Sequence, residues 1–504
     1  MLNIRAPIPL NYWVARLGSE SIPVLRQSVD TLHELMQRED EVVARELSNV
    51  ILRDPMLTLQ VLRTLQTLHP NRQITDITTI EHGVMMMGVT PFFRHFKNLP
   101  VVEDELAGNP VALHGVMKVV MRARHAALHA KNWATLLGDV ESDEVVIAAL
   151  LHDMAELLIW FFAPQLAFEI TCRMKADPAL RSGAAQQAVL GVRLSELQLA
   201  LCQEWGLPGL LQSLMDEYHA HRPRARNALL AVAFARHSAH GWWDAALPDD
   251  LNGIEGLLAL PGDEVRKIVY WVELSAIANQ QGYAAIIGAT WLPPGPSFFH
   301  KHFNSQSGDL HGFDSEELEQ TLQYLSIPAT AGRAMTSDLL HVTARDIRAI
   351  DTMACAMNGI RLALGFDRVL FLDEVDGDTL PAPRYIVGGR RAGGLPELHL
   401  SAPDGSGLKE LLSSLHEATD LALVRGTLAS LLPTPASGSN PAEDFMAMPL
   451  FNASLRRWGL IYADCRSSYT GEDGEEEIFA QFRNIVVAAE LRLDSDHTGR
   501  AEFK

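Results

Sequence analysis

The segment that decides the fold is SDEVVIAALLHDMAELLIWFFA, residues 142–163, in which one histidine and two carboxylates interrupt a long apolar run. A run of this length is close to what a membrane-spanning helix needs. However, His152, Asp153 and Glu156 fall near its centre, where each charge is expensive in lipid. A serine and two acids cap its start, and a proline follows its end. The sequence therefore predicts a buried core helix over 143–163 that holds a polar site, and no membrane span.

Helical periodicity continues on both sides of this segment, from about residue 21 to residue 289. Stretches such as DEVVARELSNVILRD (40–54) repeat apolar residues every three or four positions, which is typical of amphipathic helices. The pair Asp54-Pro55 predicts a helix start, because Asp is a capping residue and Pro suits the first helical position. These patterns predict one all-α domain over 1–290. Its further helices are expected at 184–205, 207–221, 225–240 and 263–289.

The composition changes at Trp291, where LPPGPSFFHKHFNSQSGDLHG begins with the next residue. Its Pro, Gly, Ser and His content predicts a linker over 291–313. The remainder, 314–504, is predicted to be α+β, with a largely antiparallel sheet and flanking helices. The expected strands are RVLFLDEV (368–375), RYIVGG (384–389), FMAMPLF (445–451) and RWGLIYADC (457–465), with a turn at Asn452-Ala453-Ser454, and the expected helices are 314–325, 336–364, 407–417 and 475–492.

Charge and cysteine content narrow the classes of function. The chain carries 42 Lys and Arg against 62 Asp and Glu, a net charge of −20. This balance disfavours a partner nucleic acid or an anionic membrane, since both need clustered cations. The four cysteines lie far apart with no C-x-x-C spacing, which suits a reducing cytoplasm and gives no zinc ribbon or disulfide framework. Walker A, G-x-G-x-x-G and G-x-S-x-G motifs are missing.

The first part of the chain resembles the HDOD family, a regulatory branch of the HD-domain superfamily. The resemblance covers about residues 20 to 220 and extends at most to 289. The resemblance rests on six stretches, which occur along the chain in the order SIPVLRQSVDTL, LSNVILRDPMLTLQVLR, ITDITTIEHGVMMMGV, RHAALHAKNWATLLG, ALLHDMAEL and LCQEWGLP. Active HD enzymes are phosphohydrolases with an H…HD…D pattern around one or two metal ions, which activate a water for attack on phosphorus. The resemblance implies that His125 matches the first ligand and that His152 and Asp153 match the doublet.

Two departures from that pattern argue against catalysis. The helix expected to supply the last Asp, ARNALLAVAFARHSAHGW (225–242), contains no carboxylate. Active members often read HDIGK, whereas here Ala155 and Glu156 stand at the last two positions, and a carboxylate repels a phosphate. The G-Y-P motif of diguanylate-hydrolysing members is also missing. The resemblance thus implies a degenerate site without a catalytic residue.

This residual HD site comprises His125, His152, Asp153 and Glu156, and we expect no cofactor and no metal there. If a metal ion binds, its ligands are His125, His152 and Asp153. The favoured alternative is that His152 and Asp153 form a buried hydrogen-bonded pair with His125, because a buried carboxylate needs a partner, whether a His, an Arg or an ion.

The C-terminal half resembles a GAF domain. The resemblance rests on the long helix 336–364, the strands RVLFLDE and RYIVGG, LKELLSSL (408–415), and PLFNASLRRWGLIYADC (449–465) before a closing helix. It implies a domain that binds a small ligand or mediates dimerisation. The long helix either pairs with its twin in a parallel homodimer or packs one face on its own sheet.

Together these features predict a cytoplasmic, non-catalytic signal-transduction protein with signalling proteins as partners. It joins a degenerate HDOD-like domain to a GAF-like domain that senses a ligand or dimerises. Two alternatives stay open. One is a metal-dependent HD phosphohydrolase acting on a nucleotide, and the other is a protein-interaction scaffold whose GAF-like domain binds nothing small.

Overall fold

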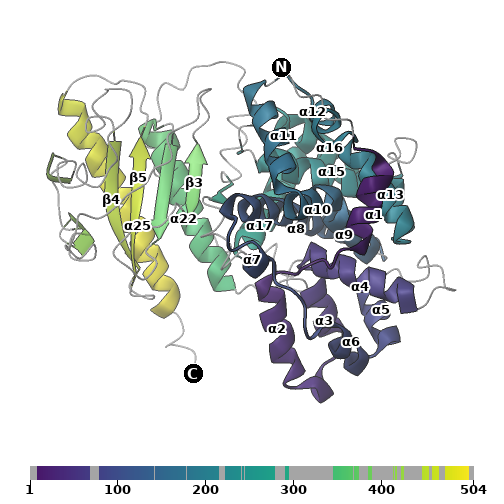
Figure 1. Ribbon diagram of the computed structural model, residues 1–504. Coiled ribbons are helices and arrows are strands. Elements are labelled where there is room, and N and C mark those ends of the chain that lie inside the picture. The colour runs from purple at the N-terminus through teal and green to yellow at the C-terminus, as the bar shows by residue number, and fades with distance from the viewer. Residues whose placement is uncertain are drawn as a thin grey trace. The chain divides into compact units, whose positions relative to one another are not determined.

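The structure is a computed structural model, and it falls into two compact units that we describe separately (Figure 1). The described residues of 8–236 and 249–260 form the first unit, and those of 237–248, 261–293 and 344–498 form the second. The structure describes residues 8–68, 79–140, 142–177, 179–214, 222–239, 241–242, 244–278, 290–293, 344–366, 368–373, 384–388, 412–413, 415–416, 422–424, 445–452, 457–464 and 472–498.

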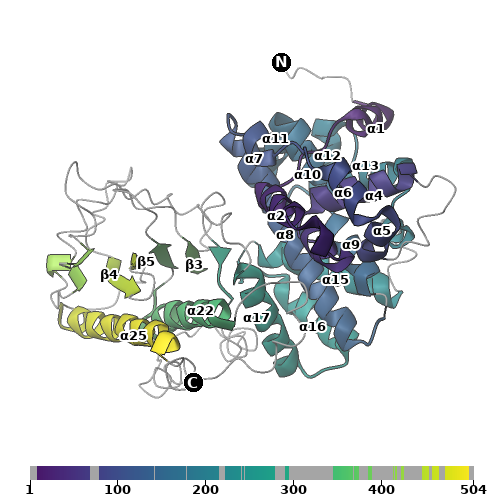
Figure 2. The same ribbon diagram turned by 90° about the horizontal axis from the view of Figure 1, so that it is seen from below.

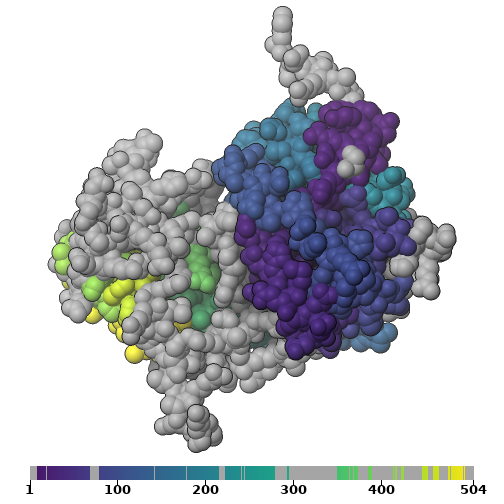
Figure 3. Space-filling model, turned by 60° about the horizontal axis from the view of Figure 1, so that its bottom comes forward, coloured from purple at the N-terminus to yellow at the C-terminus, as the bar shows by residue number. Residues whose placement is uncertain are grey.

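The described part of the first unit is helical, as the sequence predicts. Its helices are α1 (Leu10–Ser19), α2 (Arg26–Met36), α3 (Ala44–Ile51), α4 (Pro55–Leu68), α5 (Ile80–Met87), α6 (Val89–Phe96), α7 (Val102–Glu105), α8 (Pro110–Leu136), α9 (Ser142–Leu151), α10 (Met154–Phe162), α11 (Pro164–Ala176), α12 (Ser182–Leu190), α13 (Leu194–Glu204) and α14 (Gly209–Ser213), with most of α15 (Pro223–Ser238) and α16 (Leu247–Leu258). In Figure 3 the N-terminal helices, purple to blue, form one continuous surface.

Helix α8 is the long central helix of this unit. Asn109 caps its start, with its side-chain oxygen 3.1 Å from the backbone N–H of Ala112, and Pro110 follows as the first helical residue. Helices α9, α10 and α11 all pack against α8. The packing with α10 is tight at Gly115, where an added Cβ would come within 2.1 Å of the Trp160 ring. Because α9 and α10 lie directly on α8, the residues between them face the middle of α8.

The predicted start of a helix at Asp54-Pro55 is confirmed. One carboxylate oxygen of Asp54 accepts hydrogen bonds from the backbone N–H groups of Met56 (2.8 Å) and Leu57 (3.1 Å), in the first turn of α4. The other oxygen accepts from the N–H of Leu25 and the hydroxyl of Ser28, at the start of α2. A single side chain therefore caps two helices at once.

Two of the predicted helices are each divided in the structure. The segment predicted as one helix over 143–163 forms α9 and α10, which are separated at His152 and Asp153. The segment 184–205 forms α12 and α13, because Gly191 takes a left-handed conformation with φ of 79° and ends α12. Hydrophobic periodicity runs through both interruptions, so a pattern of apolar spacing alone does not reveal them.

The second unit contains a five-stranded sheet with strand order β1-β3-β2-β5-β4. The strands are β1 (Thr290–Trp291), β2 (Arg368–Asp373), β3 (Tyr385–Gly388), β4 (Phe445–Asn452) and β5 (Arg457–Asp464). All pairings are antiparallel except that of β1 with β3. Arg368 and Asp464 face one another across β2 and β5 as a buried ion pair, with Nε 2.8 Å from Oδ1. The antiparallel sheet predicted from the four later strands is confirmed, and β1 is an additional edge strand.

Helices α22 (Ala344–Leu364) and α25 (Glu472–Thr498) run side by side along one face of this sheet (Figure 2). Every residue of α22 from Ile350 to Ile360 is buried. Helix α17 (Gly262–Ala278) also packs on α22, where the Tyr270 hydroxyl donates a hydrogen bond to the buried Asp351. The sequence offered two alternatives for this helix, pairing with a second copy or packing on its own sheet. Within the unit, α22 packs against α17, α25 and the sheet.

The limits of the second unit differ from the predicted domain limits. Helix α17 was predicted within the all-α domain 1–290, but its contacts place it with the sheet. The first residue of the predicted linker, Trp291, belongs to β1, and Leu292 is fully buried in the same core. The predicted helix 314–325 and most of the linker lie outside the described residues.

One segment in the described part of the chain, Ser142–Phe162, is long and apolar enough to cross a membrane by length and composition, with a mean hydropathy of 1.9. Within its most apolar window of 18 residues, 67% is buried inside the protein. The core helix of a globular domain passes the same test, and the helix is interrupted at its centre by His152 and Asp153.

Candidate functional site

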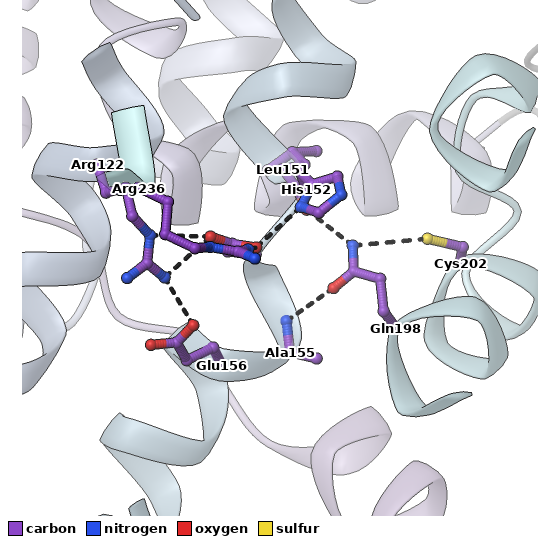
Figure 4. Close-up of polar contacts among 9 residues, drawn as sticks. Arg122, Leu151, His152, Ala155, Glu156, Gln198, Cys202 and Arg236 are labelled. Carbon is purple, nitrogen blue, oxygen red and sulfur yellow. Dashed lines mark hydrogen bonds and ion pairs between the residues drawn. The ribbon is translucent and has the colours of Figure 1, made fainter. Parts of the chain in front are cut away.

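The predicted site residues His152 and Asp153 lie at the break between α9 and α10, where the chain makes a turn (Figure 4). Gln198 from α13 bridges the two helix ends. Its side-chain nitrogen donates to the carbonyl of Leu151, and its side-chain oxygen accepts from the N–H of Ala155, both at 2.8 Å. Because the amide is buried and supplies the backbone partners that a continuous helix would supply, the break is a stable feature of the fold.

Asp153 is the centre of the site, and cationic side chains hold both of its oxygens. Nε of Arg122, on α8, lies 2.9 Å from Oδ2, and the Nη2 atom of the same guanidinium is also 2.9 Å from it. Nη2 of Arg236, on α15, lies 2.9 Å from Oδ1. Nδ1 of His152 lies 2.8 Å from the same Oδ1. Two arginines from different helices and the adjacent histidine therefore surround one carboxylate.

Glu156, in the first turn of α10, joins the same network through Arg122. Its Oε2 accepts a hydrogen bond of 2.6 Å from Nη2 of Arg122, so this one nitrogen contacts two carboxylates. Figure 4 shows Glu156 below the Arg122 guanidinium, with a dashed line that marks their contact. The side chain of Arg122 is 16% exposed and that of Asp153 11%, whereas Arg236 is 45% exposed. The interior contact with Arg122 is thus shielded from solvent more than the contact with Arg236.

The charges fix the protonation state of the site. Burial alone would raise the pKa of Asp153, but Arg122, the hydrogen bond with His152 and the charge of Arg236 hold it well below the usual range. In the same way burial opposes the charge of Arg122, while Glu156 and Asp153 raise its pKa above the ordinary value. Asp153 is therefore ionised whenever the protein is folded near neutral pH.

The arrangement does not fit a metal ion. Both oxygens of Asp153 already accept hydrogen bonds from guanidinium groups, which would have to leave before the carboxylate could bind a cation. Across the described ranges, no group of three or more His, Cys, Asp or Glu side chains could hold a metal. Asp216 and Glu217, the acids that precede the helix expected to supply the last ligand, lie outside those ranges.

The structure brings three of the four predicted site residues into one network. His152, Asp153 and Glu156 are joined through Arg122. His125 is half-buried and lies on α8 three residues after Arg122, close to the same helix face. The prediction left the partner of Asp153 open between a His, an Arg and an ion and named His125 as the histidine. The histidine that contacts Asp153 is instead the adjacent His152, and Arg122 and Arg236 are its other partners.

Sequence reasoning missed Arg122, Arg236 and Gln198. Arg122 lies 31 residues and Arg236 lies 83 residues from Asp153 along the chain, and an arginine on a helix is ordinarily a surface residue. One signal was present in the stretch 225–242, which contains no carboxylate but includes Arg236. If no metal binds Asp153, this shielded carboxylate needs a cationic side chain as its partner. Arg236 supplies one from the helix that was expected to supply an acid.

Comparison with known families agrees with the resemblance of the first part of the chain to the HDOD family. Residues 22–221 match the HDOD domain family. The match includes Arg122, Asp153, Glu156 and Gln198, whereas Arg236 follows its end. No curated protein matches the chain.

Two solved structures show weak overall likeness to the chain. A virulence factor from Campylobacter jejuni subsp. jejuni is 18% identical with a TM-score of 0.39, over 50% of this chain and 89% of that protein. The MmoQ response regulator from Methylococcus capsulatus str. Bath is 20% identical with a TM-score of 0.37, over 48% of this chain and 99% of that structure. The HDOD assignment rests on the family match, not on these structures.

Proposed function

We propose that this protein is a non-catalytic regulatory protein of signal transduction, in which the HD site has become a structural ion-pair network. The observation that carries the proposal is the capture of Asp153 by Arg122 and Arg236. In an HD phosphohydrolase this aspartate binds the metal that activates water. Here its negative charge is compensated by permanent cations that cannot accept a proton or activate a nucleophile.

The position of Glu156 supports the same conclusion. It occupies the place where active HD proteins often have a lysine, and its carboxylate is bound to Arg122 rather than to solvent alone. A phosphate group approaching Asp153 and Glu156 directly would meet two carboxylates. The network joins α8, α10 and α15, so its role is to fix the relative positions of three helices.

For the second unit we propose a GAF-like sensory domain that binds a small effector or mediates dimerisation, with signalling proteins as partners in the cytoplasm. The support is an antiparallel sheet with α22 and α25 along one face, a geometry that suits a small-ligand domain. Because α22 is covered by α17 and α25, a homodimer would use a surface other than this helix.

Metal analysis and turnover test the first part of the proposal. Purified full-length protein should contain well below one equivalent of Fe, Mn or Zn and should release no product from a panel of phosphodiesters. The matched variant is His152→Ala, which should leave the metal content unchanged. Stoichiometric metal that is lost in His152→Ala, or turnover that depends on Asp153, would identify a phosphohydrolase instead.

A thermal-shift screen of the full chain tests the second part. Small cyclic nucleotides added to the protein should raise the melting temperature if the second unit is a sensor. A concentration-dependent melting temperature without any ligand would indicate dimerisation. No response to either would favour the scaffold alternative.

A further inference from the structure

Helix α1 precedes the part of the chain that matches the HDOD family, which begins at residue 22, yet it packs on the helical unit beside α13 (Figure 1). Trp13 and Leu17, which lie four residues apart on one face of α1, are fully buried. Asn11, Tyr12 and Ala15, on its other sides, are exposed. The helix is therefore amphipathic, and one face of it is docked on the unit.

The polar contacts of this face are with the ends of two other helices. Nε1 of Trp13 donates a hydrogen bond of 3.1 Å to the carbonyl of Leu190, the last residue of α12. Nη2 of Arg16 donates a hydrogen bond of the same length to the carbonyl of Phe162, the last residue of α10. The last carbonyls of a helix have no partner within that helix, so α1 satisfies acceptors that would otherwise need water.

The C-terminal end of α1 is bound in turn by a cation of the unit. Nη2 of Arg63, on α4, donates to the carbonyl of Gly18 in the last turn of α1, at 2.8 Å, where a positive charge is favoured. The same guanidinium lies over the ring of Trp205, 4.6 Å from its centroid, and this contact holds it in place. We call the carbonyls of Phe162 and Leu190, with the side chains of Arg63 and Trp205, the α1 docking surface.

Helix α1 has little stability of its own. It is ten residues long, and isolated helices shorter than about 12 residues are marginal in water. Pro9 at its start makes no capping hydrogen bond through its side chain, and its first turn contains no acidic residue. A terminal helix of this kind unfolds locally at a lower free energy than the whole domain. The α1 docking surface can therefore be uncovered while the rest of the unit stays folded.

We propose that the α1 docking surface is a binding site for an amphipathic helix of a signalling partner, and that α1 occupies it when the partner is absent. The partner helix would supply what α1 supplies, which is a tryptophan, an arginine three positions later and an apolar residue one position after that. Buried tryptophan and arginine side chains are typical anchors of such interfaces. Because α10 ends at Phe162 and carries Glu156 in its first turn, an exchange of helices would act on the helix of the ion-pair network. The proposal rests on the proposed function only for the class of partner.

Fluorescence anisotropy with a labelled peptide of residues 8–21 tests the proposal on the full-length protein. Trp13→Ala weakens the docking of α1, so the peptide should bind this variant at least about tenfold more tightly than the wild type, in which α1 competes within the same chain. Asn11→Ala, at an exposed position of α1, is the matched control and should bind the peptide as the wild type does. Adding Arg63→Gln to Trp13→Ala removes a contact of the surface and should weaken peptide binding about fivefold or more.

The proposal is overturned if folded Trp13→Ala binds the peptide no better than the wild type, or if Arg63→Gln leaves that binding unchanged. Hydrogen exchange of the wild type is a second test, which decides the matter even if Trp13→Ala does not fold. The amides of residues 10–19 should exchange at least about tenfold faster than those of α8. Exchange as slow as that of α8 would show that the surface opens only on global unfolding, and the proposal would then be wrong. Neither result changes the metal content or the turnover measured for the non-catalytic function, so the two proposals fail separately.

Discussion

Asp54 and Asp153 are both shielded aspartates of the helical unit, and each directly precedes a helix, yet the protein stabilises them in opposite ways. Asp54 is fully buried, and its partners are three backbone N–H groups and one hydroxyl. Asp153 stands at the cap position of α10 but makes no capping bond, because Gln198 serves the backbone there. Its own oxygens bind two arginines and a histidine.

The difference appears in the pKa of each group. Burial raises the pKa of Asp54, and its four hydrogen bonds only partly offset that effect. The cations around Asp153 overcome burial and lower its pKa. Asp54 is therefore a carboxylate used for its hydrogen bonds, whereas Asp153 is one used for its charge. A carboxylate that neutralises cations from several helices needs its charge, which a capping carboxylate does not.

The largest effect is expected at Asp54. Asp54→Ala removes the caps of α2 and α4 together and leaves several buried donors unsatisfied, so it should lower the free energy of unfolding by about 3 to 5 kcal/mol. Urea denaturation measures this, with the exposed Asp30→Ala on α2 as a control that should change it by less than about 0.5 kcal/mol. A loss below about 1.5 kcal/mol would show that water replaces the side chain.

The next effect is expected at Arg122. Arg122→Ala leaves Asp153 and Glu156 without their main partner and should cost about 2 to 4 kcal/mol. Asp153→Ala should cost a similar amount, and the double variant should lose clearly less than the two single losses added together. Arg173→Ala, which breaks the exposed Arg173–Glu169 pair, is the control at about 0 to 0.5 kcal/mol. Additive losses in the double variant would mean that the two side chains do not act on each other.

The loss of stability in acid should show that Asp153 is ionised in the folded protein. Its pKa is lowered on folding, so its contribution to stability is complete above the unfolded value of about 3.9 and is lost as the pH falls below it. Unfolding measured between pH 2.5 and pH 6 should therefore show a smaller acid loss for Asp153→Asn than for the wild type. Identical pH profiles would refute the ion-pair description of this residue.

The contribution of Asp54 to stability should change with pH in the opposite direction. Its pKa is raised on folding, so the native state holds the proton more tightly, and stability falls as the pH rises from about 3.9 through the folded pKa. The difference in stability between wild type and Asp54→Asn should accordingly shrink with rising pH over this range. A difference that grows with pH would mean that the hydrogen bonds outweigh burial.

Some of this comparison could be read from the sequence. Asp54-Pro55 is a local signal, since a cap needs only the next few residues, and it predicted the start of α4 correctly. The polar interruption at His152 and Asp153 marked the site but not the helix break, because the amide that stabilises the break comes from α13. The compensating arginines could not be placed, since the contacts that define them depend on how α8, α10 and α15 pack. Local chemistry is therefore predictable here, and long-range charge pairing is not.

The smallest effect is expected at Arg236, and it tests whether the two arginines around Asp153 are equivalent. Both lie 2.9 Å from the carboxylate, but Arg236 is 45% exposed and Arg122 is 16% exposed. Solvent and salt screen an exposed pair, so Arg236→Ala should cost only about 0.5 to 1 kcal/mol. In 1 M NaCl this cost should vanish, while most of the cost of Arg122→Ala should persist. If salt reduces both costs alike, the Arg122 contact is as solvated as the Arg236 contact. Asp153 then behaves as a member of an exposed ion pair. If only the Arg236 cost vanishes, Arg122 is the shielded partner that keeps Asp153 ionised and Arg236 is a solvent-screened surface partner.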